Sequence, residues 1–265
     1  MSKLVVAGCS HTEGCAFWVN KHTTDKDVTP LSSPELQKFY KQKTVSKQWV
    51  RDNITWGAKL QHLGKYKSFL NLGRGGQGID YILRKILFYI QEKDNLTDHT
   101  FIIQIPAPER KEFFYNQKLH TFTNLVNHDE IATENKSFLF ELYNLEYYEY
   151  QTLQTALVIQ VLLESKNAKV KFFCEPFLDL QANNPKSIEH LHKILIKDTL
   201  IIRYERLLDK INFIPTKNFR AHKELYLHHA GLKVNDMHFT EKGNSKLATY
   251  LYENMEYKEN YRSLL

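Results

Sequence analysis

The sequence predicts an α/β fold, a three-layer α/β/α sandwich in which a mostly parallel sheet of about five strands lies between two layers of helices. Two observations predict it. Short apolar runs alternate four times along the chain with longer segments that have the spacing of amphipathic helices. The apolar runs also tend to end at glycine or proline, and polar residues follow. Such an alternation builds a parallel sheet with helices on both faces, and ligands bind beyond the carboxyl ends of its strands.

The expected strands are short, and the first is a continuous apolar run, as is typical of a strand that is buried on both faces. The first, "KLVVAG", stops at Gly8, the second runs into a glycine-rich turn, and the third is closed by Pro106. The four segments are 3–8, 67–72, 101–105 and 169–174.

Longer segments with apolar residues at helical spacing come between and after the strands. Gly64 ends the first of them, while Thr240 and Glu241 have the character of an N-cap and first turn for the last. The expected helices are 54–64, 78–92, 148–167, 187–209 and 240–255.

We expect a single domain over residues 1–265, because a chain of 265 residues can bury one large core and no linker or internal repeat interrupts it. Two stretches, about 15–50 and 107–143, lack a clear period. They are interpreted as insertions between core elements that line the substrate cleft.

The composition is that of a globular protein, with 42% hydrophobic and 25% charged residues. The formal net charge is +6, but the basic residues are spread along the chain and are densest in 37–51. This pattern favours a solvated basic face over a nucleic-acid interface. The first apolar run spans only about five residues and no stretch approaches ~18, so neither a signal peptide nor membrane insertion is expected.

The three cysteines, Cys9, Cys15 and Cys174, cannot all pair with one another and do not have the spacing of a zinc site. A reducing compartment is therefore expected, which predicts a cytoplasmic location.

No metal and no cofactor are expected. His190, His192, His228 and His229 lack the acidic and cysteine neighbours of a metal site, which favours structural or surface roles. The glycine run at 71–78 lacks the Gly-Lys-Ser/Thr of a nucleotide-binding P-loop.

Three separated segments carry residues suited to chemistry: "GCSHTEG" (8–14), "NLGRGGQG" (71–78) and "VNDMHFTEKGN" (234–244). A serine needs a nearby base to attack a carbonyl, and His238 has an acid two residues before it and a helix start just after it. Glycines let backbone N–H groups approach a developing oxyanion. Ser10 is therefore a candidate nucleophile.

The order of these segments resembles the GDSL, or SGNH, hydrolase family: a strand with GxSxxxG, then NxGxxG, then a late Asp/Asn-to-His turn before a terminal helix. The resemblance implies a flavodoxin-like α/β/α fold and ester hydrolysis without a cofactor. Matched residue by residue, it makes Ser10 the nucleophile and His238 the base. The backbone N–H groups of Ser10 and Gly76 would form the oxyanion hole.

The chain departs from the family pattern at two places. The family's acid lies three residues before the histidine, where this chain has Asn235, whereas Asp236 lies two residues before it. Either side chain can orient the imidazole, and only Asp236 adds charge. After the third strand the family has a turn whose asparagine donates to the oxyanion, and this chain has "PAPERKEFF". Arg110 in that segment is either the replacement donor or a surface arginine in a salt bridge.

The segment "PAPERKE", the "GCS" in place of "GDS", and the richness in Lys, Asn and Tyr are similar to phage-encoded relatives of the family. This similarity implies a virus-encoded protein that is present in the infected cell or the virion.

Four further residues border the candidate nucleophile and the glycine run. His11 and Glu13 either contact substrate or cover the turn, and Gly73 either contacts substrate or serves, like the other glycines of the run, only as a flexible strand-to-helix turn. Cys9 is expected to be a small core residue, and a competing thiol nucleophile is the alternative.

The leading hypothesis is a serine esterase or deacetylase that acts on a small acyl ester, carried by a small molecule or a glycan. One alternative is a catalytically degenerate binding or structural protein of the same fold, associated with a virion. A flavodoxin-like binder that holds a phosphate or flavin at "SHTEG" is a third. The sequence makes no prediction of the oligomeric state.

Overall fold

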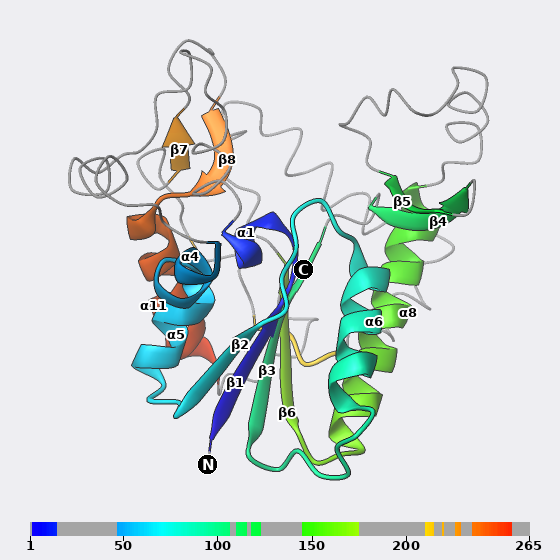
Figure 1. Cartoon of the computed structure of the whole chain (residues 1–265), viewed down its shortest axis with the longest axis horizontal. Helices are drawn as coiled ribbons and strands as arrows, with labels where there is room; N and C mark the ends of the chain where they lie inside the picture. The colour runs from blue at the N-terminus through cyan, green and yellow to red at the C-terminus, as the bar shows by residue number, and fades with distance from the viewer. Residues whose placement is uncertain are drawn as a thin grey trace.

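A computed structural model describes residues 2–14, 47–106, 110–115, 118–122, 145–174, 210–214, 219, 226–228 and 235–255. At its centre is a parallel sheet in the order β2-β1-β3-β6, flanked by helices on both faces (Figure 1). The predicted α/β fold with helices on both faces is therefore confirmed. The strands are β1 (Lys3–Ala7), β2 (Ser68–Asn71), β3 (His99–Ile105) and β6 (Lys169–Cys174).

The prediction of about five strands was wrong for the described part of the chain, where this sheet has four. Phe213 forms an isolated parallel bridge with Phe172 at the outer edge of β6. The backbone N–H of Phe172 donates to Asn212 (2.9 Å), and that of Ile214 donates to Phe172 (2.7 Å). The next residue, Pro215, has no N–H to extend such a ladder.

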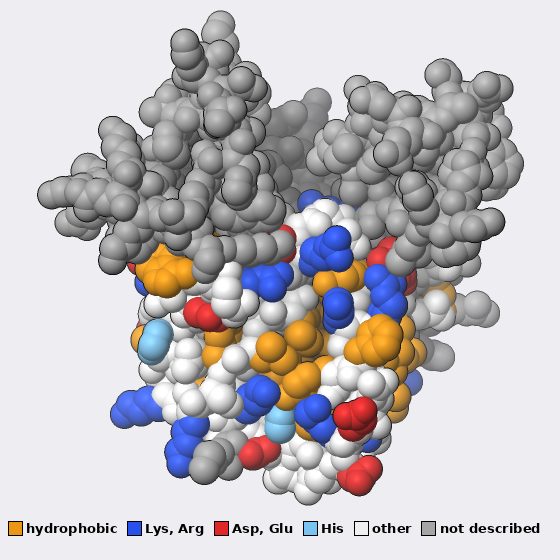
Figure 2. All heavy atoms as spheres, in the orientation of Figure 1, with side chains coloured by type: hydrophobic (Ala, Val, Ile, Leu, Met, Phe, Trp, Pro, Cys, Tyr) orange, Lys and Arg blue, Asp and Glu red, His pale blue; other side chains and the backbone are white. Residues whose placement is uncertain are grey.

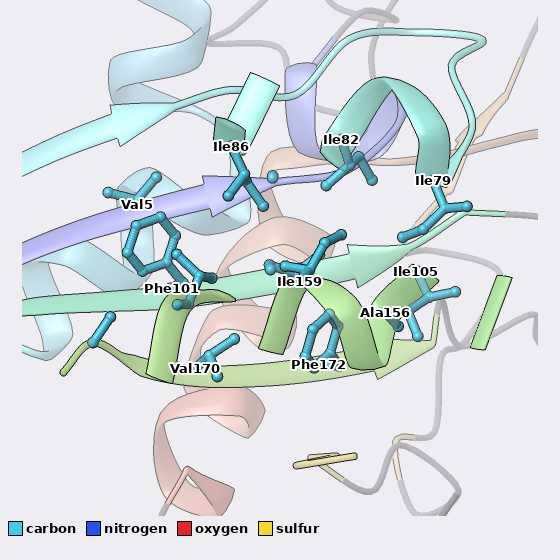
Figure 3. Packing of buried hydrophobic residues seen from close by; sticks show 14 of the residues in the cluster. Val5, Ile79, Ile82, Ile86, Phe101, Ile105, Ala156, Ile159, Val170 and Phe172 are labelled. Atoms are coloured by element: carbon cyan, nitrogen blue, oxygen red, sulfur yellow. The ribbon is translucent and has the colours of Figure 1, made fainter. Parts of the chain in front are cut away.

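The central strands β1 and β3 are buried along most of their length, which is why their apolar runs are continuous rather than alternating, whereas β2 and β6 have exposed and half-buried positions. Leu4 and Val6 of β1 pack in the core beneath α5 (Trp56–Leu63) and α11 (Glu241–Asn254). The core on the other face is packed against α6 (Ile79–Ile90) and α8 (Leu145–Glu164). Figure 3 shows residues of this second core, among them Val5, Ile82, Ile86, Phe101, Ile159 and Phe172.

The helix ends follow the expected capping signals. The Thr240 hydroxyl accepts a hydrogen bond from the Gly243 N–H (3.0 Å), so the predicted cap of the last helix is confirmed. Thr55 caps α5 in the same way. The long helix begins and ends three residues earlier than its predicted span of 148–167. The helix predicted over 187–209 lies outside the described residues.

Two antiparallel pairs were not predicted. In the second insertion, β4 (Lys111–Tyr115) pairs with β5 (Lys118–Phe122). Near the C-terminus, β7 (Tyr226–His228) pairs with β8 (Asn235–Phe239). The interpretation of the segment before the last helix as a turn was therefore wrong. Its strand pairs with the nearby β7, and the composition of the segment itself does not reveal this partner.

Most of the first insertion lies outside the described residues, and α4 (Lys47–Asn53) is its described end. None of the helices in the described segments is long and apolar enough to cross a membrane. On the face shown in Figure 2, basic side chains lie in several separate places among acidic and apolar ones.

Candidate active site

Ser10 lies at the carboxyl end of β1, where the chain turns directly into a one-turn helix, α1 (Ser10–Glu13) (Figure 1). The helix begins after Cys9, whose backbone is extended, and the Gly14 N–H closes the turn on the Ser10 carbonyl (2.9 Å). Ser10 is only 6% exposed, and no described residue hydrogen-bonds its hydroxyl. Helix geometry thus fixes the backbone of Ser10 and leaves its hydroxyl available to a base.

The turn after β2 lies against α1. The Asn71 side chain donates to the Thr12 carbonyl (2.6 Å) and accepts from the Gly73 N–H (2.8 Å). The Arg74 N–H donates to the Gly8 carbonyl (3.1 Å). The segments 8–14 and 71–78 therefore meet at the carboxyl edge of the sheet, as the order of elements predicts.

Both carboxylate oxygens of Glu13 bind protein groups. Oε1 lies 3.0 Å from Nη2 of Arg51, and Oε2 accepts from the Gly75 N–H at 2.6 Å. The same Arg51 nitrogen donates to the Gly73 carbonyl (2.8 Å). In the structure, the Glu13 carboxylate and the Gly73 carbonyl bind groups of the protein itself. Contact of either residue with substrate remains a prediction.

Gly76 adopts a left-handed backbone conformation, with φ of +73°, and a side chain there would meet no atom within 4 Å. Glycine adopts this conformation at no steric cost. The described protein thus leaves open space beside Gly76, which is the residue that the family resemblance assigns to the oxyanion hole.

The chain beyond β3 returns to the same edge of the sheet. A Cβ on Gly78 would overlap the Arg110 carbonyl, so the backbone of Arg110 packs directly against the start of α6. Nη1 of Arg110 is buried, and no residue in the described ranges accepts a hydrogen bond from it. Because most buried donors have an acceptor, this nitrogen is an exception that calls for one.

The strand β8 comes next to α1. The ring of Phe239 meets the ring of His11 edge-on, with centroids 5.5 Å apart, and both side chains are buried. His238 precedes Phe239 in this strand. The side chains of Asn235, Asp236 and His238 lie outside the described residues, so their distances from Ser10 remain predictions.

Cys9 is fully buried, in agreement with its expected place in the core. Sequence reasoning missed Asn71 and Arg51, which hold the glycine turn. Asn71 carried a signal, because it opens the quoted "NLGRGGQG". Arg51 carried none, since it reaches the turn from α4, a helix that was not predicted.

No profile of a known protein family and no curated protein matches this sequence. Solved structures match it in fold. The crystal structure of TesA is 11% identical, covers 96% of this chain and 98% of its own, and has a TM-score of 0.50. A member of the lipolytic G-D-S-L family from Veillonella parvula is 12% identical over 97% of this chain and 100% of its own, with a TM-score of 0.49. LAE5, an α/β hydrolase enzyme from the metagenome of Lake Arreo, is 11% identical over 96% and 94%, with a TM-score of 0.48.

At 11% identity, the likeness to TesA shows the fold alone. The chain is a parallel α/β protein with helices on both faces of its sheet, and the helical turn that begins at Ser10 follows the first strand. The predicted α/β fold is thus confirmed, and it is similar to the fold of TesA.

Proposed function

We propose that this protein is a serine hydrolase of the GDSL/SGNH type that cleaves a small acyl ester, borne by a small molecule or a carbohydrate. The observation that carries the proposal is the placement of Ser10. It opens a buried helical turn at the carboxyl end of β1, between the glycine turn after β2 and the strand β8. These three elements bear the residues that the family resemblance assigns to catalysis.

In the proposed reaction, Ser10 Oγ forms a bond to the ester carbonyl carbon as its proton passes to a ring nitrogen of His238. The charge develops on the former carbonyl oxygen. The intermediate then breaks its bond to the leaving alkoxide, which takes the proton from the imidazolium and departs as the alcohol. Water repeats both steps on the acyl-serine, which releases the acid and restores Ser10.

We assign the supporting acid to Asp236. Residues two apart in a strand share a face, and neighbours alternate between faces. The strand β8 runs over Asn235–Phe239. Asp236 is therefore expected on the same face of the strand as His238, and Asn235 on the opposite face. A carboxylate beside the imidazole stabilises its cation and fixes its tautomer.

The oxyanion is expected to bind the backbone N–H groups of Ser10 and Gly76, and Arg110 is the proposed third donor. Two observations support these assignments. The space beside Gly76 is open, and Nη1 of Arg110 is a buried donor without an acceptor in the described structure. An arginine would supply charge where the family uses a neutral amide.

The proposal is tested by turnover of p-nitrophenyl acetate, a short aryl ester with a good leaving group. We expect steady release of the phenol above the uncatalysed rate. A rate no higher than that of buffer, with p-nitrophenyl esters of both short and longer acyl groups, would contradict the proposal and favour a binding module.

Replacing Arg110 with methionine separates its catalytic role from a structural one. We expect turnover to fall by about 10²-fold, the typical effect of losing one oxyanion donor. The free energy of unfolding should stay the same or rise by up to about 1 kcal/mol, because a buried donor without an acceptor costs about 1–3 kcal/mol. The two measurements are ester kinetics and chemical denaturation.

Arg84 provides the matched control. Its guanidinium binds the Glu112 carboxylate with two nitrogens, one at 2.9 Å, and the Glu112 side chain is 7% exposed. Replacing Arg84 with methionine should therefore destabilise the protein, because it leaves a buried carboxylate unpaired, and should spare turnover. Equal effects of the two substitutions on turnover would contradict the role of Arg110.

A further inference from the structure

We infer that Glu13 and Arg51 form a positioning pair, which sets the direction of the Gly76 N–H relative to Ser10. The inference rests on the proposed function, since it concerns the same oxyanion hole. Neither residue touches the reacting atoms in this account. They act through the glycine turn.

The pair joins three elements at one buried point. Glu13 belongs to α1, Arg51 to α4, and the groups they bind belong to the turn after β2. The Glu13 side chain is 3% exposed and that of Arg51 22% exposed. A carboxylate that accepts from a cation and a backbone N–H forms charge-assisted hydrogen bonds, which are roughly twice as strong as neutral ones.

The position of the bond to Gly75 gives the pair its effect on catalysis. Gly75 N is held 2.6 Å from Glu13 Oε2, and the next backbone nitrogen is that of Gly76. Only the φ and ψ angles of Gly75 separate the two N–H groups. The Gln77 N–H donates to the Arg74 carbonyl (3.4 Å), which closes the turn around both glycines. The bond from Gly75 to Glu13 therefore also positions the proposed oxyanion donor.

The Glu13 carboxylate also fixes the position of the glycine turn relative to the nucleophile, Ser10. Glu13 and Ser10 lie at the two ends of a single helical turn, so a bond from Glu13 to the loop fixes the loop against the backbone of Ser10. Donors that stabilise an oxyanion must be in place before the charge develops, and a displacement of 1 Å can cost about 10²-fold in rate. Loosening the loop should therefore slow the chemical step without weakening substrate binding.

Glu13→Gln tests this role with little change of shape. The amide has one acceptor oxygen for two donors, so one of the bonds is lost. We expect kcat to fall by about 10–100-fold and KM to stay within about twofold. Gly75 amide exchange, followed by NMR, should be faster than in the wild type, and this second readout needs no activity.

Arg51 offers a graded test, because a single nitrogen, Nη2, binds both the Glu13 carboxylate and the Gly73 carbonyl. A lysine ammonium can bind the same two oxygens, so Arg51→Lys should retain several times more turnover than Arg51→Met. The double variant Glu13→Gln/Arg51→Met should be little slower than the slower single variant, since coupled residues are not additive.

Lys59→Met is the matched control, since it removes another partly buried ion pair, that of Lys59 Nζ with Glu241 Oε1 at 2.7 Å. This pair joins α5 to α11 and does not touch the glycine turn, so kcat and Gly75 exchange should be unchanged. A Glu13→Gln enzyme with wild-type kcat, or one whose KM alone changes, would overturn the positioning role.

The test separates this inference from the proposed function. If the wild type neither hydrolyses esters nor reacts with a fluorophosphonate, the proposed function fails. Gly75 should even then exchange faster in Glu13→Gln, and equal exchange in the two proteins would overturn the pairing itself.

Discussion

Replacing Ser10 with alanine is expected to lower turnover of a short aryl ester by about 10⁴-fold or more, because no other group would form the acyl intermediate. The fold should be retained. The backbone bond from Gly14 to the Ser10 carbonyl does not involve the side chain, and alanine is the best helix former. We therefore expect the free energy of unfolding to change by no more than about 0.5 kcal/mol. Ester kinetics and denaturation with urea measure the two effects.

Cys9→Ser is the control for a competing nucleophile. Cys9 is fully buried beside Ser10, and the substitution keeps its approximate size while removing the thiol. Turnover should be retained. A protein in which Cys9→Ser abolishes activity and Ser10→Ala does not would identify the thiol as the nucleophile. Equal, slow release of the phenol by wild type and Ser10→Ala would favour a binding module.

Replacing Asp236 with asparagine is expected to lower kcat by about 10³–10⁴-fold, the scale seen when a catalytic histidine loses its carboxylate partner. The amide can still accept a hydrogen bond, but it cannot stabilise the imidazolium. Asn235→Ala should cost less than about tenfold, because an amide contributes orientation at most. The readouts are kcat for both variants and their unfolding midpoints, which should remain close to that of the wild type.

The reverse order of effects would overturn this assignment. If Asn235→Ala were the slower enzyme and Asp236→Asn nearly normal, Asn235 would be the residue that holds the ring. Such a result would indicate a hydrolase that works without a carboxylate in this position, which is a weaker catalyst.

Much of the central sheet could be predicted from the sequence because it depends on local signals. Short segments rich in apolar residues marked β1, β2, β3 and β6, and Thr240 and Gly64 marked helix ends. The β4–β5 and β7–β8 pairs each join strands that are close in the chain, but they depend on pairing across the two strands rather than on the composition of either strand alone. Nothing in the local composition of Asn235–Phe239 distinguished such a strand from a turn.

The candidate site divides in the same way. The positions of Ser10 and the glycine run at the ends of strands were predictable, since small residues directly after an apolar strand are typical of a tight turn. The bonds from Asn71 to Thr12 and from Arg51 to Glu13 depend on how distant elements pack. Glu13 shows the consequence: its sequence position next to the nucleophile indicated substrate contact or a cover for the turn, and its carboxylate binds the protein.

Covalent labelling with a fluorophosphonate tests the central claim most directly, because the reagent reacts with an activated serine and not with one that merely caps a helix. Peptide mapping by mass spectrometry should place one adduct on Ser10. The adduct should be absent from Ser10→Ala and should form more slowly when p-nitrophenyl acetate is present. An unlabelled wild-type protein, or an adduct on any other residue, would contradict the assignment of Ser10 as the nucleophile.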